Sequence, residues 1–175
     1  ALIDADQQKC SQDWITGTRD KLLSRIEIID QAEFIASENV DVDFLLIDTQ
    51  GSLTKEMAQF LFQSSLIITP CRVSRDDIVG QGWIEVFLKQ SNRDIKKAPI
   101  LTVLNGVNKR SSILSHVIEQ LKEDGVQVAE TCISQRVCFA ETNVNKVSVI
   151  GYNKQATEEI VDLTNEALNL IKSET

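Results

Sequence analysis

The ten residues from Asp43 to Ser52 constrain the fold of this chain more than any other stretch. They read D-F-L-L-I-D-T-Q-G-S, so four apolar residues stand between two carboxylates, and Gly51 follows three positions after Asp48. An uninterrupted apolar run of this length is typical of a strand buried on both faces, as in a parallel sheet. We therefore expect a central strand over residues 43–48, with Asp48 at the carboxyl end, where open α/β sheets bind their ligands.

Short apolar runs alternate with helical patterns along the rest of the chain. Further strands are expected over residues 1–6, 26–29, 66–69 (ended by Pro70), 99–104 (ended by Asn105) and 126–133. Helices are expected over residues 11–25, 54–63, 78–90, 155–172, and from Ser111 or Ser112 to Gly125. This alternation predicts right-handed βαβ crossovers and a doubly wound, mainly parallel sheet with helices on both faces. No repeat or linker interrupts it, so residues 1–175 are expected to form one domain.

Charge, hydropathy and cysteine usage exclude several classes of protein. The formal net charge of −8 argues against a protein that coats nucleic acid through its overall field. No apolar run approaches the roughly 20 residues that a membrane-spanning helix needs. The four cysteines form no C-x-x-C pair, and Cys71 and Cys132 lie in or beside apolar runs, which favours buried free thiols. We expect a cytoplasmic protein without a membrane partner.

Polar side chains follow three of the expected strands, where this class of fold binds ligands. Asp4 and Asp6 follow the first strand, Asp48 and Gly51 the central one, and Asn105 a later one. A magnesium ion would relieve the repulsion between neighbouring carboxylates, and a backbone N–H at Gly51 can reach a phosphate oxygen. An amide at a strand end can pair with the edge of a base. Each feature also occurs in ordinary solvated turns, but together they favour a nucleotide site.

Five segments, in this order, resemble a known family over nearly all 175 residues. They are L-I-D-A-D-Q-Q, D-F-L-L-I-D-T-Q-G-S-L, S-L-I-I-T-P-C-R-V-S-R-D-D-I-V-G, L-T-V-L-N-G-V-N and T-C-I-S-Q-R-V-C-F-A-E-T. They resemble the second-strand motif, the Walker B and switch region, the following strand and loop, the adenine-side strand and the Q-R segment of the ParA/MinD family of deviant Walker-type partition ATPases. The resemblance implies a P-loop NTPase-like fold with ATP and magnesium as cofactors.

The resemblance also implies roles for particular residues. Asp6, in the D-x-D motif with Asp4, would position the attacking water during ATP hydrolysis. Asp48 would hold magnesium through a water molecule. Gly51 would sense the γ-phosphate, and Asn105 would bind adenine.

Family members act in plasmid or chromosome partition as dimers around two ATP molecules. They bind DNA non-specifically when ATP is bound, and a centromere-binding ParB-like partner stimulates them. The resemblance therefore implies a homodimer with these two partners. Arg136, in the Q-R segment, and the basic pair Lys109-Arg110 are the candidate DNA or dimer contacts. On an acidic chain such pairs are also common as solvated surface.

Two departures from the family pattern limit what the resemblance implies. Gln7 stands where the family usually has proline, and no G-x-x-x-x-G-K-[ST] occurs in the chain. We expect the first strand, the phosphate loop and the first helix to lie before Ala1, so that residues 1–175 form an N-terminally incomplete domain that does not hydrolyse ATP alone. Two alternatives stay open: a nucleotide-independent protein-interaction module on the same fold, or a relative that positions conjugative DNA or a protein cargo.

Overall fold

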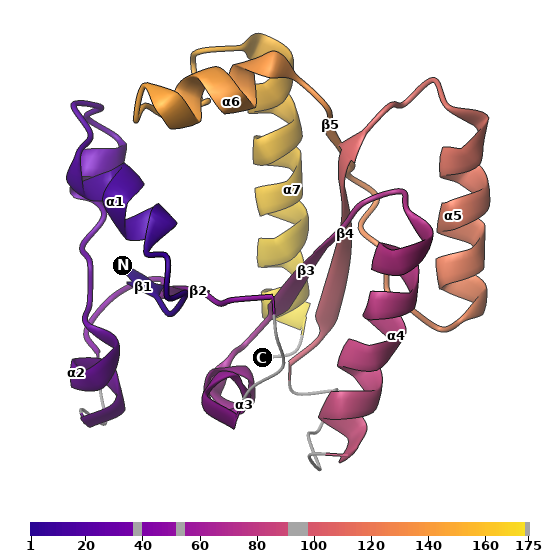
Figure 1. Ribbon diagram of the computed structural model, residues 1–175, viewed down its shortest axis with the longest axis horizontal. Coiled ribbons are helices and arrows are strands. Elements are labelled where there is room, and N and C mark those ends of the chain that lie inside the picture. The colour runs from indigo at the N-terminus through magenta and orange to yellow at the C-terminus, as the bar shows by residue number, and fades with distance from the viewer. Residues whose placement is uncertain (37–39, 52–54, 91–97, 174–175) are drawn as a thin grey trace.

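The computed structural model describes residues 1–36, 40–51, 55–90 and 98–173 as an α/β domain (Figure 1). Every described strand pair is parallel, and helices cover both faces of the main sheet, which confirms the predicted fold class. The elements in chain order are β1 (Leu2–Asp4), α1 (Cys10–Thr16), the 3₁₀ turn η1 (Leu23–Arg25), α2 (Gln31–Ala36), β2 (Leu46–Asp48), α3 (Lys55–Gln63), β3 (Ile67–Cys71), α4 (Arg75–Gln90), β4 (Ile100–Val107), α5 (Ser112–Glu123), β5 (Ile133–Ser134), α6 (Val137–Val144) and α7 (Lys154–Ser173).

The strands form two separate pieces of sheet. β1 pairs with β2, while β3, β4 and β5 form a second piece in that order. The expectation of a central strand at 43–48, buried on both faces, is therefore wrong. β2 is three residues long, and the side chains of Phe44 and Leu46 are 59% and 62% exposed. β2 pairs only with β1 among the described strands, and neither Phe44 nor Leu46 belongs to a hydrophobic cluster of the described residues.

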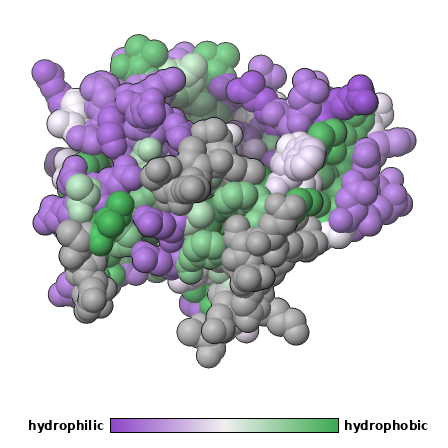
Figure 2. Space-filling view, turned by 60° about the horizontal axis from the view of Figure 1, so that its bottom comes forward, coloured by the Kyte–Doolittle hydropathy of each residue, from purple (hydrophilic) through white to green (hydrophobic). Residues whose placement is uncertain are grey.

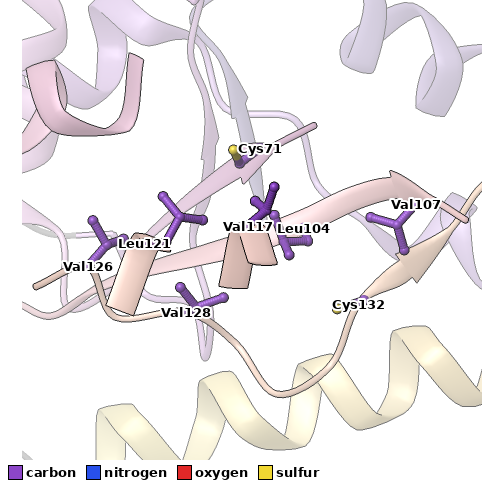
Figure 3. Packing of buried hydrophobic residues seen from close by; sticks show 8 residues of the cluster. All are labelled: Cys71, Leu104, Val107, Val117, Leu121, Val126, Val128 and Cys132. Atoms are coloured by element: carbon purple, nitrogen blue, oxygen red, sulfur yellow. The ribbon is translucent and has the colours of Figure 1, made fainter. Parts of the chain in front are cut away.

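The core lies around β4, whose side chains alternate between two helical layers. Leu104 packs with Val117 and Leu121 of α5 on one face (Figure 3). Leu101 and Val103 contribute to a second cluster on the other face, against which side chains of α7 pack. Leu101 and Leu104 are almost completely buried. Helices thus pack on both faces of the sheet, as the alternation of strands and helices in the sequence predicts.

Several boundaries differ from the sequence expectations because pairing and packing override local signals. Pro70 does not end its strand but lies inside β3, where an edge strand tolerates the missing N–H. β4 continues through Asn105 to Val107, with a register shift at Gly106, whose φ is +68°. The helix expected over 11–25 ends at Thr16, before Gly17.

Three other elements depart from expectation in length or presence. α4 begins at Arg75, earlier than expected, and the strand expected over 126–133 is reduced to the two residues of β5 and a bridge between Thr102 and Val128. The short helix α6 was not expected at all. Among the described helices, none combines the length and the apolar character that crossing a membrane requires.

Candidate functional site

The carboxylate of Asp4 shapes the loop at the end of β1. Asp4 is buried, and its two oxygens accept hydrogen bonds from the backbone N–H groups of Asp6 at 3.1 Å and Gln12 at 2.9 Å. The side-chain ammonium of Lys9 donates a hydrogen bond to the backbone carbonyl of Asp4, and the backbone of Lys9 has a positive φ of 51°. Asp4 thus fixes the path of the chain from β1 into α1. Both carboxylate oxygens of Asp4 accept hydrogen bonds from backbone N–H groups, so Asp4 is suited to holding the loop in position.

Asp6 lies on the loop that Asp4 holds. It is half-buried, and its Oδ1 accepts a hydrogen bond from the Gln8 N–H at 2.8 Å, which closes a tight turn. The turn forms with Gln7 in place of the proline typical of the resembling family. The carboxylate of Asp6 therefore has a defined position just beyond the carboxyl end of β1.

Asp48 lies directly beside Asp4, because the two residues are partners in the parallel register of β1 and β2. The structure thus confirms that two acidic strand ends are neighbours. Asp48 is exposed, and its Oδ2 accepts a hydrogen bond from the Ser11 hydroxyl at 2.5 Å. Sequence reasoning missed Ser11. The only signal was its place in the first turn of the helix that follows the D-x-D motif, 37 residues before Asp48.

The donor set at Asp48 suits magnesium only as part of a larger site. Carboxylate and hydroxyl oxygens are ligands that Mg²⁺ accepts, and the ion usually completes its octahedron with water and substrate phosphates. No group of three or more His, Cys, Asp or Glu side chains in the described part of the chain is arranged to hold a metal ion. A magnesium ion at Asp48 would therefore depend on a bound phosphate.

A cavity of about 660 Å³ opens beside the end of β2. Thr49, Gln50 and Gly51 line one end of it, and β3, α3 and α4 line the rest. Its charged lining residues are Asp76 and Asp77, and neither lysine nor arginine is among the described residues around it. A triphosphate needs cationic or N–H donors, so these walls alone do not form a phosphate site. A Cβ built on Gly51 meets no atom within 4 Å, so local space does not require glycine there.

Asn105 lies within β4, exposed, at the position paired with Ile133 of β5. The register shift and the positive φ of Gly106 follow directly, which turns the strand locally. No hydrogen bond among the described residues joins Asn105 to Asp6 or Asp48. The structure therefore brings the acidic strand ends together and leaves Asn105 on the other piece of sheet.

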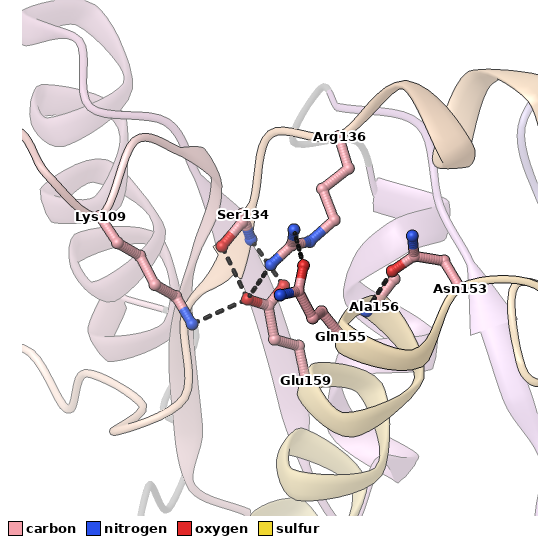
Figure 4. A network of polar contacts seen from close by, with 7 residues as sticks. All are labelled: Lys109, Ser134, Arg136, Asn153, Gln155, Ala156 and Glu159. Atoms are coloured by element: carbon pink, nitrogen blue, oxygen red, sulfur yellow. Dashed lines mark hydrogen bonds and ion pairs between the residues drawn. The ribbon is translucent and has the colours of Figure 1, made fainter.

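Glu159 of α7 forms ion pairs with Lys109 and Arg136, two of the three residues predicted to contact DNA or a second subunit (Figure 4). Its Oε1 lies 2.8 Å from Lys109 Nζ and 3.1 Å from the Arg136 guanidinium. The backbone N–H and the hydroxyl of Ser134 donate to the same carboxylate at 3.0 and 2.7 Å. Arg136 also donates to the Gln155 side-chain oxygen at 2.9 Å. Lys109 and Arg136 thus serve an internal network. Lys109 and Arg110 are both exposed, and of the two only Lys109 contacts Glu159.

The network sets the charge state of Glu159. Burial alone would raise its pKa, but hydrogen bonds from Lys109, Ser134 and Arg136 outweigh burial and lower the pKa from 4.5 to about 2. Glu159 is therefore ionised at neutral pH although only 7% of the residue is exposed. Sequence reasoning missed Glu159 because its partners are 23 to 50 positions away, which no local pattern reports.

Parallel strands between two helical layers, with carboxylates at neighbouring strand ends, define an open parallel α/β domain. Comparison with solved structures shows that the fold is of the ParA/MinD type. A scan against models of protein families finds no match, and a search of curated protein sequences finds none.

Two solved structures illustrate the fold. One is described as a plasmid partition protein of Borrelia burgdorferi B31 bound to AMPPNP, with a TM-score of 0.68 and 16% identity over 96% of this chain and 85% of that chain. The other is the cell division ATPase MinD of Pyrococcus furiosus, with a TM-score of 0.58 and 19% identity over 73% of this chain and 52% of that chain.

Proposed function

We propose that residues 1–175 form the body of a ParA-type ATPase that binds ATP with magnesium. The observation that carries this proposal is the register of β1 and β2, which sets Asp4 beside Asp48 and places Asp6 on the loop immediately beyond. The ParA/MinD-type fold supports it, as does the AMPPNP bound to the Borrelia neighbour. No other described strand pair places two carboxylates at its carboxyl end.

The proposed chemistry is in-line transfer of the γ-phosphoryl group to water, in which positioning and charge neutralisation supply most of the catalysis. Asp6 would orient the attacking water, and Asp4 holds the loop that carries Asp6. Asp48 would hold magnesium through water, with the Ser11 hydroxyl fixing the carboxylate orientation. When bound, magnesium neutralises charge on the phosphates. Gly51 would contact the γ-phosphate, and Asn105 would contact adenine.

The proposed site needs a phosphate-binding loop that residues 1–175 do not contain. The sequence contains no G-x-x-x-x-G-K-[ST], and the described walls of the cavity beside Asp48 carry no cation. We propose that a segment outside residues 1–175 supplies this loop. Residues 1–175 alone are then expected to bind ATP weakly and not to hydrolyse it.

The proposed biological role is plasmid or chromosome partition in the cytoplasm, as an ATP-dependent homodimer on DNA with a ParB-like partner. Arg110 is the first residue to test for DNA contact, since Lys109 and Arg136 are bound to Glu159. A nucleotide-independent interaction module is the second candidate. It is favoured by an exposed apolar row on α4, formed by Val79, Trp83 and Val86 at helical spacing.

The test uses the natural full-length protein with Asp6→Asn and, as a control, Asp41→Asn. Asn at position 6 still accepts the hydrogen bond from Gln8 but lacks the charge. We expect ATP turnover to fall by about 10²-fold or more, with the affinity for a fluorescent ATP analogue nearly unchanged. The exposed Asp41 should tolerate the same change. Unaltered turnover in Asp6→Asn, or no ATP binding by the full-length protein, would reject the ATPase and favour the interaction module.

A further inference from the structure

The backbone at Lys146 has a conformation that favours glycine. Its φ is +52°, in the left-handed region that residues with a side chain seldom adopt. Lys146 lies two residues after the end of α6, and the N–H of the adjacent Val147 donates to the carbonyl of the buried Thr142 at 3.0 Å. The loop is thus fixed on α6, with a lysine where glycine would be unstrained.

The side chain of Lys146 binds the carboxyl-terminal half of α1. Its ammonium donates to the Asp13 carboxylate at 2.8 Å and to the Asp13 carbonyl at 3.0 Å, across 133 positions of sequence. Figure 1 shows that α6 extends toward α1. Carbonyls near the end of a helix lack partners within the helix and attract cations. α1 has no basic residue in its own last turn, so Lys146 supplies the missing positive charge.

Gly17, directly after α1, leaves room for this lysine. Its φ is −90°, which other residues also adopt, so the backbone does not require glycine there. A Cβ built on Gly17 would lie 2.6 Å from Lys146 Nζ and 2.7 Å from Lys146 Cδ, which is too close. A lysine therefore stands where the backbone favours glycine, and a glycine stands where the lysine side chain requires one.

Two more hydrogen bonds join the same two segments. The Thr18 hydroxyl donates to the Lys146 carbonyl at 2.5 Å, and the Ser148 N–H donates to the Asp20 carboxylate at 2.9 Å. The chain after α1 and the chain after α6 are thus connected through both side-chain and backbone groups. Lys146 contributes to this junction with its ammonium and with its carbonyl.

Direct strand pairing does not hold the first piece of sheet against the second. Both β2 and β3 line the cavity of about 660 Å³, and no backbone hydrogen bond among the described residues joins these two strands. Figure 2 shows apolar residues gathered in the middle of this face, flanked by hydrophilic ones. Side-chain contacts, among them those of Lys146, therefore help to position the first piece.

The amino-terminal end of α1 reaches the proposed site. The Ser11 hydroxyl contacts the Asp48 carboxylate at 2.5 Å, and the Gln12 N–H donates to the Asp4 carboxylate at 2.9 Å. α1 is only seven residues long, so a displacement of its carboxyl-terminal end also displaces Ser11 and Gln12. The helix is thus held by the site at one end and by the loop after α6 at the other.

We infer that Lys146 is a positioning residue: seated over Gly17, it sets the position of α1 and, through α1, the contact between Ser11 and Asp48. Its effect on ATP turnover rests on the proposed function, because Asp6 lies on the loop between β1 and α1 and would move with the helix. Its effect on α1 does not rest on nucleotide binding and can be measured without ATP.

The first test follows amide hydrogen exchange in α1 by mass spectrometry, with the natural full-length protein and without ATP. Lys146→Gly removes the side chain and suits the left-handed backbone, so it introduces no strain. We expect α1 to exchange at least about fivefold faster in this variant. Lys154→Ala is the control, because that side chain is 89% exposed, and it should leave exchange in α1 unchanged. Equal exchange in the two variants would overturn the inference.

Gly17→Ala tests the same contact from the other side. The added Cβ should displace the ammonium from Asp13 and speed exchange in α1 by a similar factor, whereas Gly82→Ala, whose Cβ meets no atom within 4 Å, should not. In a protein that already carries Lys146→Gly, the change at position 17 should add less than about twofold, because the side chain it displaces is gone. Fully additive effects of the two changes would overturn the inference.

ATP turnover by the full-length protein separates positioning from a purely structural role. Lys146→Gly should lower kcat at least about fivefold and change KM less than about twofold, because it misplaces the groups around the attacking water and leaves the phosphate loop untouched. An unchanged kcat, in a natural protein that hydrolyses ATP, would overturn the inference. If the natural protein binds no ATP, the proposed function fails and the exchange measurements alone decide the role of Lys146.

Discussion

Replacement of Glu159 by glutamine offers the sharpest test of the internal charge network. The substitution keeps the size of the side chain. It removes the negative charge of the carboxylate that Lys109, Arg136 and Ser134 all contact. The lowering of the pKa from 4.5 to about 2 corresponds to about 3 kcal/mol of folding stability at pH 7. Lys109 is half exposed, so water can solvate its ammonium group when the carboxylate is removed, which reduces the loss. We therefore expect Glu159→Gln to lower the free energy of unfolding by about 2–3 kcal/mol.

The same pKa predicts how this difference depends on pH. The folded-state pKa lies below the unfolded one, so the carboxylate stabilises the fold fully above about pH 4.5 and loses that effect as the pH falls toward 2. The difference in unfolding free energy between the natural protein and Glu159→Gln should therefore be smaller at pH 3.5 than at pH 7, by about 1 kcal/mol.

Urea unfolding of the natural protein and of two variants measures these differences. Glu158→Gln is the matched control, because Glu158 is the neighbouring residue on α7, is largely exposed and has only a 3.9 Å ion pair with Lys154. It should change stability by less than about 0.5 kcal/mol. A Glu159→Gln protein as stable as Glu158→Gln, or a difference that grows as the pH falls, would refute the reasoning.

Two further predictions concern the core and the thiols. Leu104→Ala should lower the free energy of unfolding by about 2–5 kcal/mol, because Leu104 is fully buried between the sheet and α5, whereas Ile113→Ala on the exposed face of α5 should change it by less than about 0.5 kcal/mol; equal losses in urea unfolding would contradict the described packing. With a thiol reagent at pH 8, we expect one fast-reacting thiol, Cys10, and four in urea, since Cys71 is buried and burial raises its pKa to about 11; rapid reaction of Cys71 in the folded protein would count against this assignment.

The candidate site could be predicted from the sequence only in part. The D-x-D motif and the later Asp48 each follow an apolar run, and parallel strands bring their ends to one edge, so their proximity is predictable. The hydroxyl of Ser11 at Asp48 is not, because it depends on where α1 starts and how it packs. The partners of Glu159 were equally hidden from local patterns. These residues are far apart along the chain, and the packing of α7 beside β5 brings them into contact.

The sequence by itself determined the parallel α/β class, since strand and helix periodicities are local properties of the chain. It also determined the burial of Cys71 and Cys132 within apolar runs. Tertiary structure alone decided whether the apolar run at 43–48 was buried. An apolar run predicts a strand whose two faces are both covered, and only the fold shows what packs on each face. In the described chain Leu46 is exposed, and β2 pairs only with β1, so the sheet is in two pieces.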